Sequence, residues 1–115
     1  VAPGILARHY ATSHPLVLGD AVSLIARAHQ QEPIPRIATI SFNRNFSAIP
    51  SAYQFQLSPS SDLAEAARRL FAAMRLADEM DIDLIIADKF PDHGLGRAIN
   101  DRLTRASTDQ QLLFT

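Results

Sequence analysis

One stretch decides the fold of this chain: residues 82–103, which read IDLIIADKFPDHGLGRAINDRL. Its first six residues form an apolar run that is typical of a central strand buried on both faces of a parallel sheet. A loop with Gly94 and Gly96 follows, and apolar side chains then recur at helical spacing. A strand, a glycine loop and a helix N-terminus in this order can offer backbone N–H groups to an anion.

Further strands and helices are predicted before and after this stretch. Short apolar or alternating runs predict the strands. Asp20 precedes the first predicted helix and a serine-rich turn, residues 58–62, begins the second. Because strands alternate with helices, we predict an α/β fold, a three-layer Rossmann-like sandwich with a mainly parallel sheet. The predicted strands are 15–18, 36–42, 82–87 and an edge strand at 53–57; the predicted helices are 20–31, 62–80 and one after the glycine loop; residues 110–114 form a final short strand or a frayed end.

Each predicted helix has one apolar stripe, which is expected to face the sheet. The stripe of the first helix consists of Val22, Leu24, Ile25 and Ala28; that of the second consists of Leu63, Ala67, Leu70, Phe71, Met74 and Ala77; that of the last consists of Leu95, Ile99, Leu103 and Ala106.

Composition limits the class of protein. A chain of 115 residues with 47% hydrophobic and 20% charged residues is long enough for one globular domain. Its formal net charge of −1 gives no electrostatic reason to expect nucleic-acid or membrane binding. The chain has no cysteine, no apolar run that could span a bilayer and no signal peptide. We therefore expect a cytoplasmic protein.

The glycine loop is a candidate anion or nucleotide site, but it matches no complete nucleotide motif. A dinucleotide fingerprint needs a third glycine where Ile99 stands, and the loop lacks the Lys-Ser/Thr ending of a phosphate loop. The competing and favoured interpretation is that the two glycines provide unusual backbone angles at a strand-to-helix turn. The candidate binding residues are Gly94, Leu95, Gly96, Asn100 and Arg102.

The remaining polar residues suggest no catalytic or metal site. On the last helix, Asp101 stands four residues from both Arg97 and Arg105, which predicts exposed ion pairs. The four histidines have no metal-ligand spacing, and the chain has no Gly-x-Ser-x-Gly elbow or paired-carboxylate arrangement. We expect no metal and no catalytic residue in this chain.

Three segments resemble the long form of threonylcarbamoyl-adenylate synthase. Residues 2–11 (APGILARHYA) resemble the family's interdomain linker, and residues 67–78 (ARRLFAAMRLAD) resemble one of its helices. Residues 94–103 (GLGRAINDRL) match its closing motif almost letter for letter. One departure is Thr12, where the family has proline, so we expect this end of the linker to be less rigid.

The resemblance implies a function for the parent enzyme. Enzymes of this family join L-threonine, bicarbonate and ATP, with Mg²⁺, into threonylcarbamoyl-adenylate and pyrophosphate, for modification of adenosine 37 in tRNA. Catalysis belongs to a preceding YrdC-like domain in the same polypeptide. Residues 1–13 would then be the interdomain linker, which acts as a lid over that domain through Pro3, Gly4, His9 and Tyr10. Residues 14–115 would be the small Rossmann-like C-terminal domain, with no cofactor of its own and no direct contact with nucleic acid.

Two alternatives do not need a parent enzyme. The glycine loop is compatible with a small nucleotide- or phosphate-binding module that works alone. The predicted edge strand at 53–57 is compatible with an interaction or dimerisation module, because an edge strand can pair with another chain.

Overall fold

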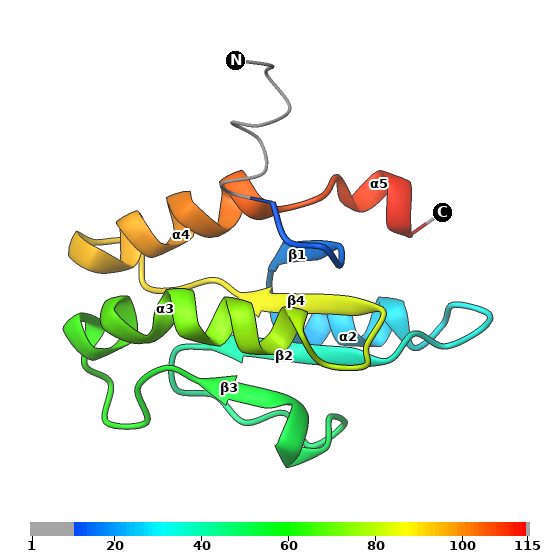
Figure 1. Cartoon of the computed structure of the whole chain (residues 1–115), viewed down its shortest axis with the longest axis horizontal. Coiled ribbons are helices and arrows are strands. Elements are labelled where there is room, and N and C mark those ends of the chain that lie inside the picture. The colour runs from blue at the N-terminus through cyan, green and yellow to red at the C-terminus, as the bar shows by residue number, and fades with distance from the viewer. Residues whose placement is uncertain (1–10, 115) are drawn as a thin grey trace.

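The computed structural model describes residues 11–114, which form strands and helices in alternation (Figure 1). In chain order the elements are β1 (Leu16–Gly19), α2 (Ala21–Ala28), β2 (Ile37–Ser41), the 3-10 helix η1 (Ser51–Tyr53), β3 (Gln54–Gln56), α3 (Leu63–Asp78), β4 (Leu84–Asp88), α4 (Gly94–Ala106) and α5 (Gln110–Leu113).

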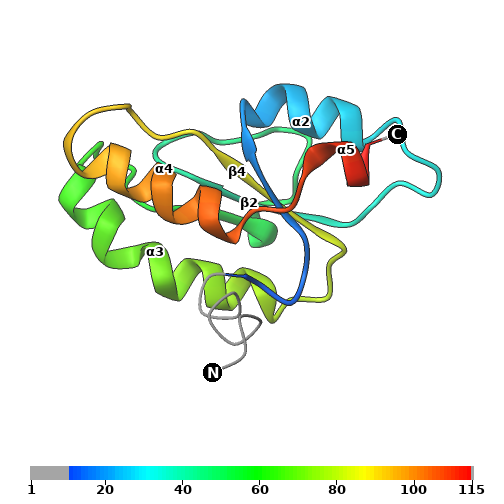
Figure 2. The same cartoon turned by 90° about the horizontal axis from the view of Figure 1, so that it is seen from above.

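The four strands form one parallel sheet with the order β1-β4-β2-β3. α3 and α4 lie on one face of the sheet and α2 lies on the other, which gives three layers (Figure 2). β4 lies between β1 and β2, and β3 forms one edge. The predicted fold class, the central strand and the edge strand are therefore confirmed.

Each face of the sheet has its own core. Ile85 and Ala87 of β4 pack with α3 and α4, whereas Leu84 and Ile86 pack with α2 on the opposite face. Successive side chains of a strand point to opposite faces, so a strand covered on both sides needs an unbroken apolar run. All five residues of β4 are buried accordingly.

Aspartates begin the first two helices, as predicted. The Asp20 carboxylate accepts from the Ser23 N–H at 3.1 Å, and the Asp62 carboxylate accepts from the Ala64 N–H at 3.0 Å. These bonds satisfy N–H groups that have no partner within the helix. The first helix ends at Ala28, three residues before the predicted end.

Three predicted stripe residues are instead exposed: Phe71 is 57% exposed, Val22 52% and Leu95 47%. The buried face of α3 is rich in alanine (Ala66, Ala73 and Ala77), and small side chains allow a helix to pack closely against its neighbours. The larger Phe71 ring lies beside this face and not within it. Val22 and Leu95 stand in the first turns of α2 and α4. The first turn of α4 lies beyond the ends of the strands in Figure 1.

The C-terminal end is a short helix, so the prediction of a strand or frayed end at 110–114 is wrong. Asp109 caps α5 by accepting from the Gln111 N–H at 2.9 Å. The Gln110 side chain donates to the Leu18 carbonyl at 3.1 Å. No helix within residues 11–114 is long and apolar enough to cross a membrane.

Candidate functional site

Residues 91–96, called the glycine turn below, comprise the end of the loop after β4 and the first three residues of α4. Gly94 has a φ of 53°, a left-handed conformation that favours glycine. A Cβ atom on Gly96 would stand 1.9 Å from the Pro91 carbonyl oxygen. Both glycines are therefore required by backbone geometry, which supports the structural interpretation of the turn.

Asn100 joins α4 to the chain that leaves β4. Its side-chain oxygen accepts from the Phe90 N–H at 2.8 Å, and its amide nitrogen donates to the Phe90 carbonyl at 2.9 Å. The Arg102 guanidinium lies 4.8 Å from the centre of the Phe71 ring, on the flank of α3. Two of the predicted binding residues thus make intramolecular contacts at separate places.

The carboxyl ends of β1, β2 and β4 meet at one edge of the sheet, which we call the carboxyl edge. This is where parallel α/β sheets usually bind ligands. A hollow of about 470 Å³ at this edge is lined by Asp20, Phe42, Asn43, Arg44, Asp88, Lys89, Phe90 and Pro91.

Arg44 forms ion pairs with both acidic side chains of this hollow. Asp88 is only 5% exposed. Its carboxylate accepts a hydrogen bond of 2.8 Å from the N–H of Ala21, the first residue of α2, and forms an ion pair of 3.2 Å with Arg44. Arg44 also pairs with Asp20 at 3.4 Å. The Asp88 charge raises the pKa of Arg44, and the Ser23 hydroxyl bond lowers the pKa of Asp20. An incoming anion would compete with the Asp88 carboxylate for these donors.

A second hollow at this edge lies against α4, between Lys89 and Thr104. One predicted ion pair is wrong here, because Arg97 pairs with Asp92 at 3.3 Å and not with Asp101. The other is confirmed, since Arg105 pairs with Asp101 at 3.2 Å. These side chains are more than half exposed, so each pair contributes little to stability.

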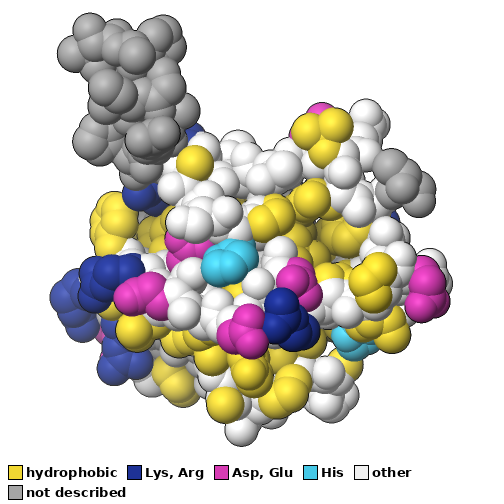
Figure 3. Space-filling view, turned by 45° about the vertical axis from the view of Figure 1, so that its right-hand side comes forward, with side chains coloured by type: hydrophobic (Ala, Val, Ile, Leu, Met, Phe, Trp, Pro, Cys, Tyr) yellow, Lys and Arg dark blue, Asp and Glu magenta, His cyan; other side chains and the backbone are white. Residues whose placement is uncertain are grey.

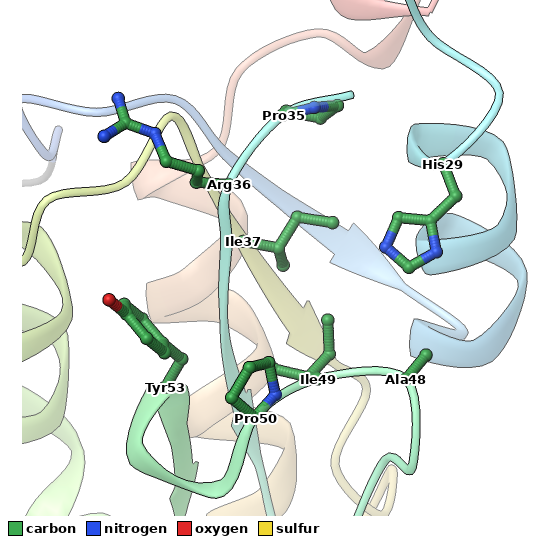
Figure 4. A pocket seen from close by; sticks show the side chains of 8 residues that line it. All are labelled: His29, Pro35, Arg36, Ile37, Ala48, Ile49, Pro50 and Tyr53. Atoms are coloured by element: carbon green, nitrogen blue, oxygen red, sulfur yellow. The ribbon is translucent and has the colours of Figure 1, made fainter. Parts of the chain in front are cut away.

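A smaller pocket of about 250 Å³ lies near the start of β2, at the opposite edge of the sheet (Figure 4). The His29 ring faces an apolar wall that includes Ile37 and Ile49. The Arg36 guanidinium turns away from it and pairs with Asp81 at 2.7 Å and with Asp83 at 3.0 Å. Figure 3 shows that hydrophobic side chains on this side of the molecule lie among acidic and basic ones.

The chain enters β1 through a polar contact with the end of α3, which we call the linker root (Ser13, His14 and Asp78). The Asp78 carboxylate accepts from the backbone N–H groups of Ser13 and His14, each at 2.8 Å. It also contacts the His14 ring Nδ1 at 2.9 Å. The Thr12 hydroxyl donates to the His14 carbonyl, so the threonine at the family's proline position adds a hydrogen bond of its own.

Residues 1–108 match the sequence model of the family described as threonylcarbamoyl-AMP synthase, C-terminal domain. The chain belongs to this family.

Curated relatives and solved structures agree with that assignment. The chain is 29% identical to the threonylcarbamoyl-AMP synthase of Bacillus subtilis over 93% of its own length, and 32% identical to that of Pyrococcus abyssi over 92%. Each match covers 32% of the relative, so the chain spans about a third of the length of these enzymes.

Two solved structures are similar in fold. One is the crystal structure of Pyrococcus abyssi Sua5 complexed with L-threonine, with a TM-score of 0.67 and 25% identity over 85% of this chain and 29% of that one. The other is the C-terminal Sua5 domain of a Pyrococcus horikoshii protein, with a TM-score of 0.58 and 20% identity, covering 84% of this chain and 96% of that domain. The second comparison shows the fold alone.

The threonylcarbamoyl-AMP synthase motifs occupy structural positions in this domain. In the closing motif, Gly96 and Asn100 fix the glycine turn, and Ile99 and Leu103 are buried in the core. The helix motif at 67–78 ends on Asp78, the acceptor of the linker root. The predicted lid residues, Pro3, Gly4, His9 and Tyr10, lie outside the described residues.

Sequence reasoning missed three features: the cluster of Asp20, Arg44 and Asp88, the pocket beside His29, and the linker root. Each brings together residues from separate segments, and no local motif marks them. Only the rule that parallel sheets bind ligands at their carboxyl ends would have pointed to the first. Within residues 11–114, no group of three or more His, Asp or Glu side chains is arranged to hold a metal ion.

Proposed function

We propose that this domain is a non-catalytic accessory domain of a threonylcarbamoyl-AMP synthase, and that residues 1–13 act as a lid over the catalytic domain. The observation that carries the proposal is the family match over residues 1–108 by a chain that spans about a third of its relatives. The parent enzyme would use ATP, L-threonine and bicarbonate for tRNA modification. We assign these substrates and Mg²⁺ to a preceding YrdC-like domain.

The reaction gives a physical reason for a lid. Carboxythreonine and an acyl-adenylate are both labile in water, so a segment that excludes water protects them between steps. A lid needs a fixed point of attachment, and the linker root provides hydrogen bonds that could serve as one. The C-terminal domain would then hold the far end of the lid.

The full-length synthase with His9→Ala and Tyr10→Ala tests the lid. We expect slower formation of threonylcarbamoyl-AMP and a higher ratio of ATP consumed to product released. The matched control is His93→Ala, because His93 is exposed and its side chain makes no capping hydrogen bond. If the double variant and the control have the same turnover and the same ratio, the lid proposal is wrong.

Nucleotide or phosphate binding by the domain itself is the second candidate function. The hollow beside the start of α2, with Arg44 and Lys89 in its wall, is the observation in its favour. The Asp88 carboxylate at the Ala21 N–H weighs against it. Titration of the domain with ATP, AMP or pyrophosphate, followed by NMR, tests this function; no shift near Lys89 or residues 94–100 at millimolar ligand would reject it.

A further inference from the structure

The outer surfaces of α3 and α4 combine apolar and basic side chains. On α3, Arg68, Phe71 and Arg75 recur at three- and four-residue spacing, so they lie on one side of the helix. Leu95 and Arg102 are two helical turns apart and share one side of α4. The two sides meet where the Arg102 guanidinium lies 4.8 Å from the centre of the Phe71 ring. We call the surface defined by these five residues the α3–α4 face.

Folding of the domain leaves the large apolar side chains of this face in solvent. Phe71 is 57% exposed and Leu95 is 47% exposed. Phe71 belongs to the segment 67–78 that resembles a helix of the family, yet the core contacts of that segment come from Met74 and Ala77 on its buried side. Aromatic side chains and arginines that gather on one surface are typical of the centre of a protein–protein contact.

The α3–α4 face is basic, although the whole chain has a net charge of −1. Among residues 11–114, neither Arg68 nor Arg75 forms an ion pair with an acidic side chain, whereas the neighbouring Arg69 pairs with Glu65 at 3.3 Å. A partner with an apolar centre and carboxylates around it is complementary to such a surface. A second copy of the same face is not, because it would bring arginine against arginine.

The chain enters the domain at the ends of these two helices. The backbone N–H groups of Ser13 and His14 bind Asp78, the last residue of α3. The Thr108 N–H, just beyond the end of α4, donates to the Leu16 carbonyl at 2.7 Å. Figure 2 shows the start of the described chain on the side of the sheet that carries α3 and α4, away from α2.

The relatives show how much polypeptide lies outside this domain. About two thirds of each curated relative is not covered by the match, and the family is that of a C-terminal domain. In those relatives most of the remaining length therefore precedes the domain. A preceding domain in the same polypeptide would be tethered on the α3 and α4 side, and a tether raises the effective concentration of one domain at the other.

The size of the α3–α4 face suits contact between domains. α3 has 16 residues, so it is about 24 Å long at a rise of 1.5 Å per residue. Two helices side by side, each about 10 Å across, give a surface of roughly 500 Å². Covering it would bury about 1,000 Å² in total, and interfaces between domains of one chain typically bury about 600–1,500 Å².

From these observations we propose that the α3–α4 face docks the preceding domain of the same polypeptide, through a surface of that domain with an apolar centre and carboxylates around it. Phe71 is the apolar anchor, and the arginines set the orientation. The inference rests on the proposed function, because it needs a preceding domain. It needs neither a lid nor any particular path for residues 1–10.

Thiol labelling of the full-length synthase measures whether the face is covered. Leu95→Cys places a probe on the face and keeps Phe71. The matched control is Val22→Cys on α2, because Val22 is 52% exposed and both positions are the second residue of their helix. This chain has no cysteine, and any in the preceding domain are replaced by serine. A face that is covered about nine-tenths of the time should make labelling at position 95 about tenfold slower than at position 22. Equal labelling rates overturn the proposal.

Removal of the anchor should uncover the probe. Phe71→Ser, added to Leu95→Cys, should return labelling at position 95 to the rate of the Val22→Cys control, without loss of the fold because Phe71 is exposed. Leu112→Ser, which removes a 75% exposed leucine from α5, should leave labelling slow. Arg68→Glu with Arg75→Glu should also speed labelling. Slow labelling that neither Phe71→Ser nor the double arginine variant changes overturns the proposal.

The remaining outcomes identify a different occupant or separate the inference from the proposed function. Slow labelling that depends on synthase concentration means that a second copy covers the face, and slow labelling only after addition of tRNA means that a nucleic acid does; each overturns the proposal. Formation of threonylcarbamoyl-AMP by the wild type tests the proposed function independently. A synthase that forms this product but labels equally at both positions keeps the proposed function and loses the docking. A protein that forms none, yet shows slow labelling that Phe71→Ser relieves, loses the proposed function and keeps a docked preceding domain.

Discussion

The carboxyl edge and the linker root use their polar groups in opposite ways. At the carboxyl edge, where α/β proteins usually bind ligands, Asp88 accepts from Ala21 and pairs with Arg44, and Asn100 binds the Phe90 backbone. At the linker root, Asp78 instead accepts from the backbone N–H groups of Ser13 and His14, just before β1. The polar groups of the carboxyl edge are thus used within the domain, which weighs against capture of a small molecule there.

The largest effect is expected at Gly96. A Cβ atom on Gly96 would collide with the Pro91 carbonyl oxygen, whereas a Cβ atom on Gly94 would meet nothing within 4 Å. Gly96→Ala should therefore destabilise the domain by about 3 kcal/mol, through forced movement of the backbone. Gly94→Ala, the control, should cost about 1 kcal/mol, through its positive φ alone. Chemical denaturation measures both, and an equal or smaller loss for Gly96→Ala would contradict the structural interpretation of the glycine turn.

Asn100 gives the next largest effect. Asn100→Ala leaves the N–H and carbonyl of Phe90 without their partners, and we expect a loss of about 2 kcal/mol in the free energy of unfolding. Asp101→Ala, one residue along the same helix, removes only an exposed ion pair and should cost less than about 0.5 kcal/mol. If both variants were equally stable, Asn100 would be available for a ligand, and the contrast between the two regions would weaken.

The stretch that contains Gly96 and Asn100, together with α3, also shows what the sequence could and could not predict. β4 and α3 were predictable because a continuous apolar run and a helical stripe are local patterns, as the buried residues Ile85 and Leu70 show. The glycine pair was recognised as a turn, but the carbonyl of Pro91 that requires Gly96 becomes visible only in three dimensions. Asp78 looks like an ordinary exposed helix-end acid in the sequence.

The error at Phe71 has a similar cause. The spacing of Phe71 matches the apolar stripe of α3. The buried face of the helix, however, includes the small side chains of Ala66, Ala73 and Ala77, and the Phe71 ring remains exposed beside Arg102. Hydrophobic periodicity locates a helix face to within about one residue position, and the sizes of neighbouring side chains then decide which edge of that face is buried.

The pair formed by Arg44 and Asp88 sharpens the description of the carboxyl edge. A double-mutant cycle with Arg44→Gln and Asp88→Asn should give a coupling energy of about 1 kcal/mol, because Asp88 is buried but Arg44 is partly exposed. The cycle is measured by urea denaturation. A coupling energy near zero would mean that the two charged side chains do not stabilise one another, and Arg44 would then be available to bind an anion.

The smallest effect is expected at Asp83, which precedes β4 as Ser13 and His14 of the linker root precede β1. The guanidinium of Arg36 donates to the Asp83 carboxylate at 3.0 and 3.1 Å, and the Arg36 N–H donates to it at 2.8 Å. The Arg36 side-chain hydrogen bond is the main reason that the pKa of Asp83 is lowered from 3.8 to about 2. A carboxyl whose pKa is lower in the folded state stabilises the fold above its unfolded pKa and loses this contribution as the pH falls through the folded value.

The free-energy difference between the wild type and Asp83→Asn should therefore be constant above about pH 5 and shrink between about pH 4 and pH 2. Because both side chains are about half exposed, the difference should also shrink in 1 M salt, where the Debye length is about 3 Å. Urea denaturation across this pH range, at low and high salt, provides the measurement. A difference that stays constant down to pH 2 would show that Asp83 acts through its neutral hydrogen bonds.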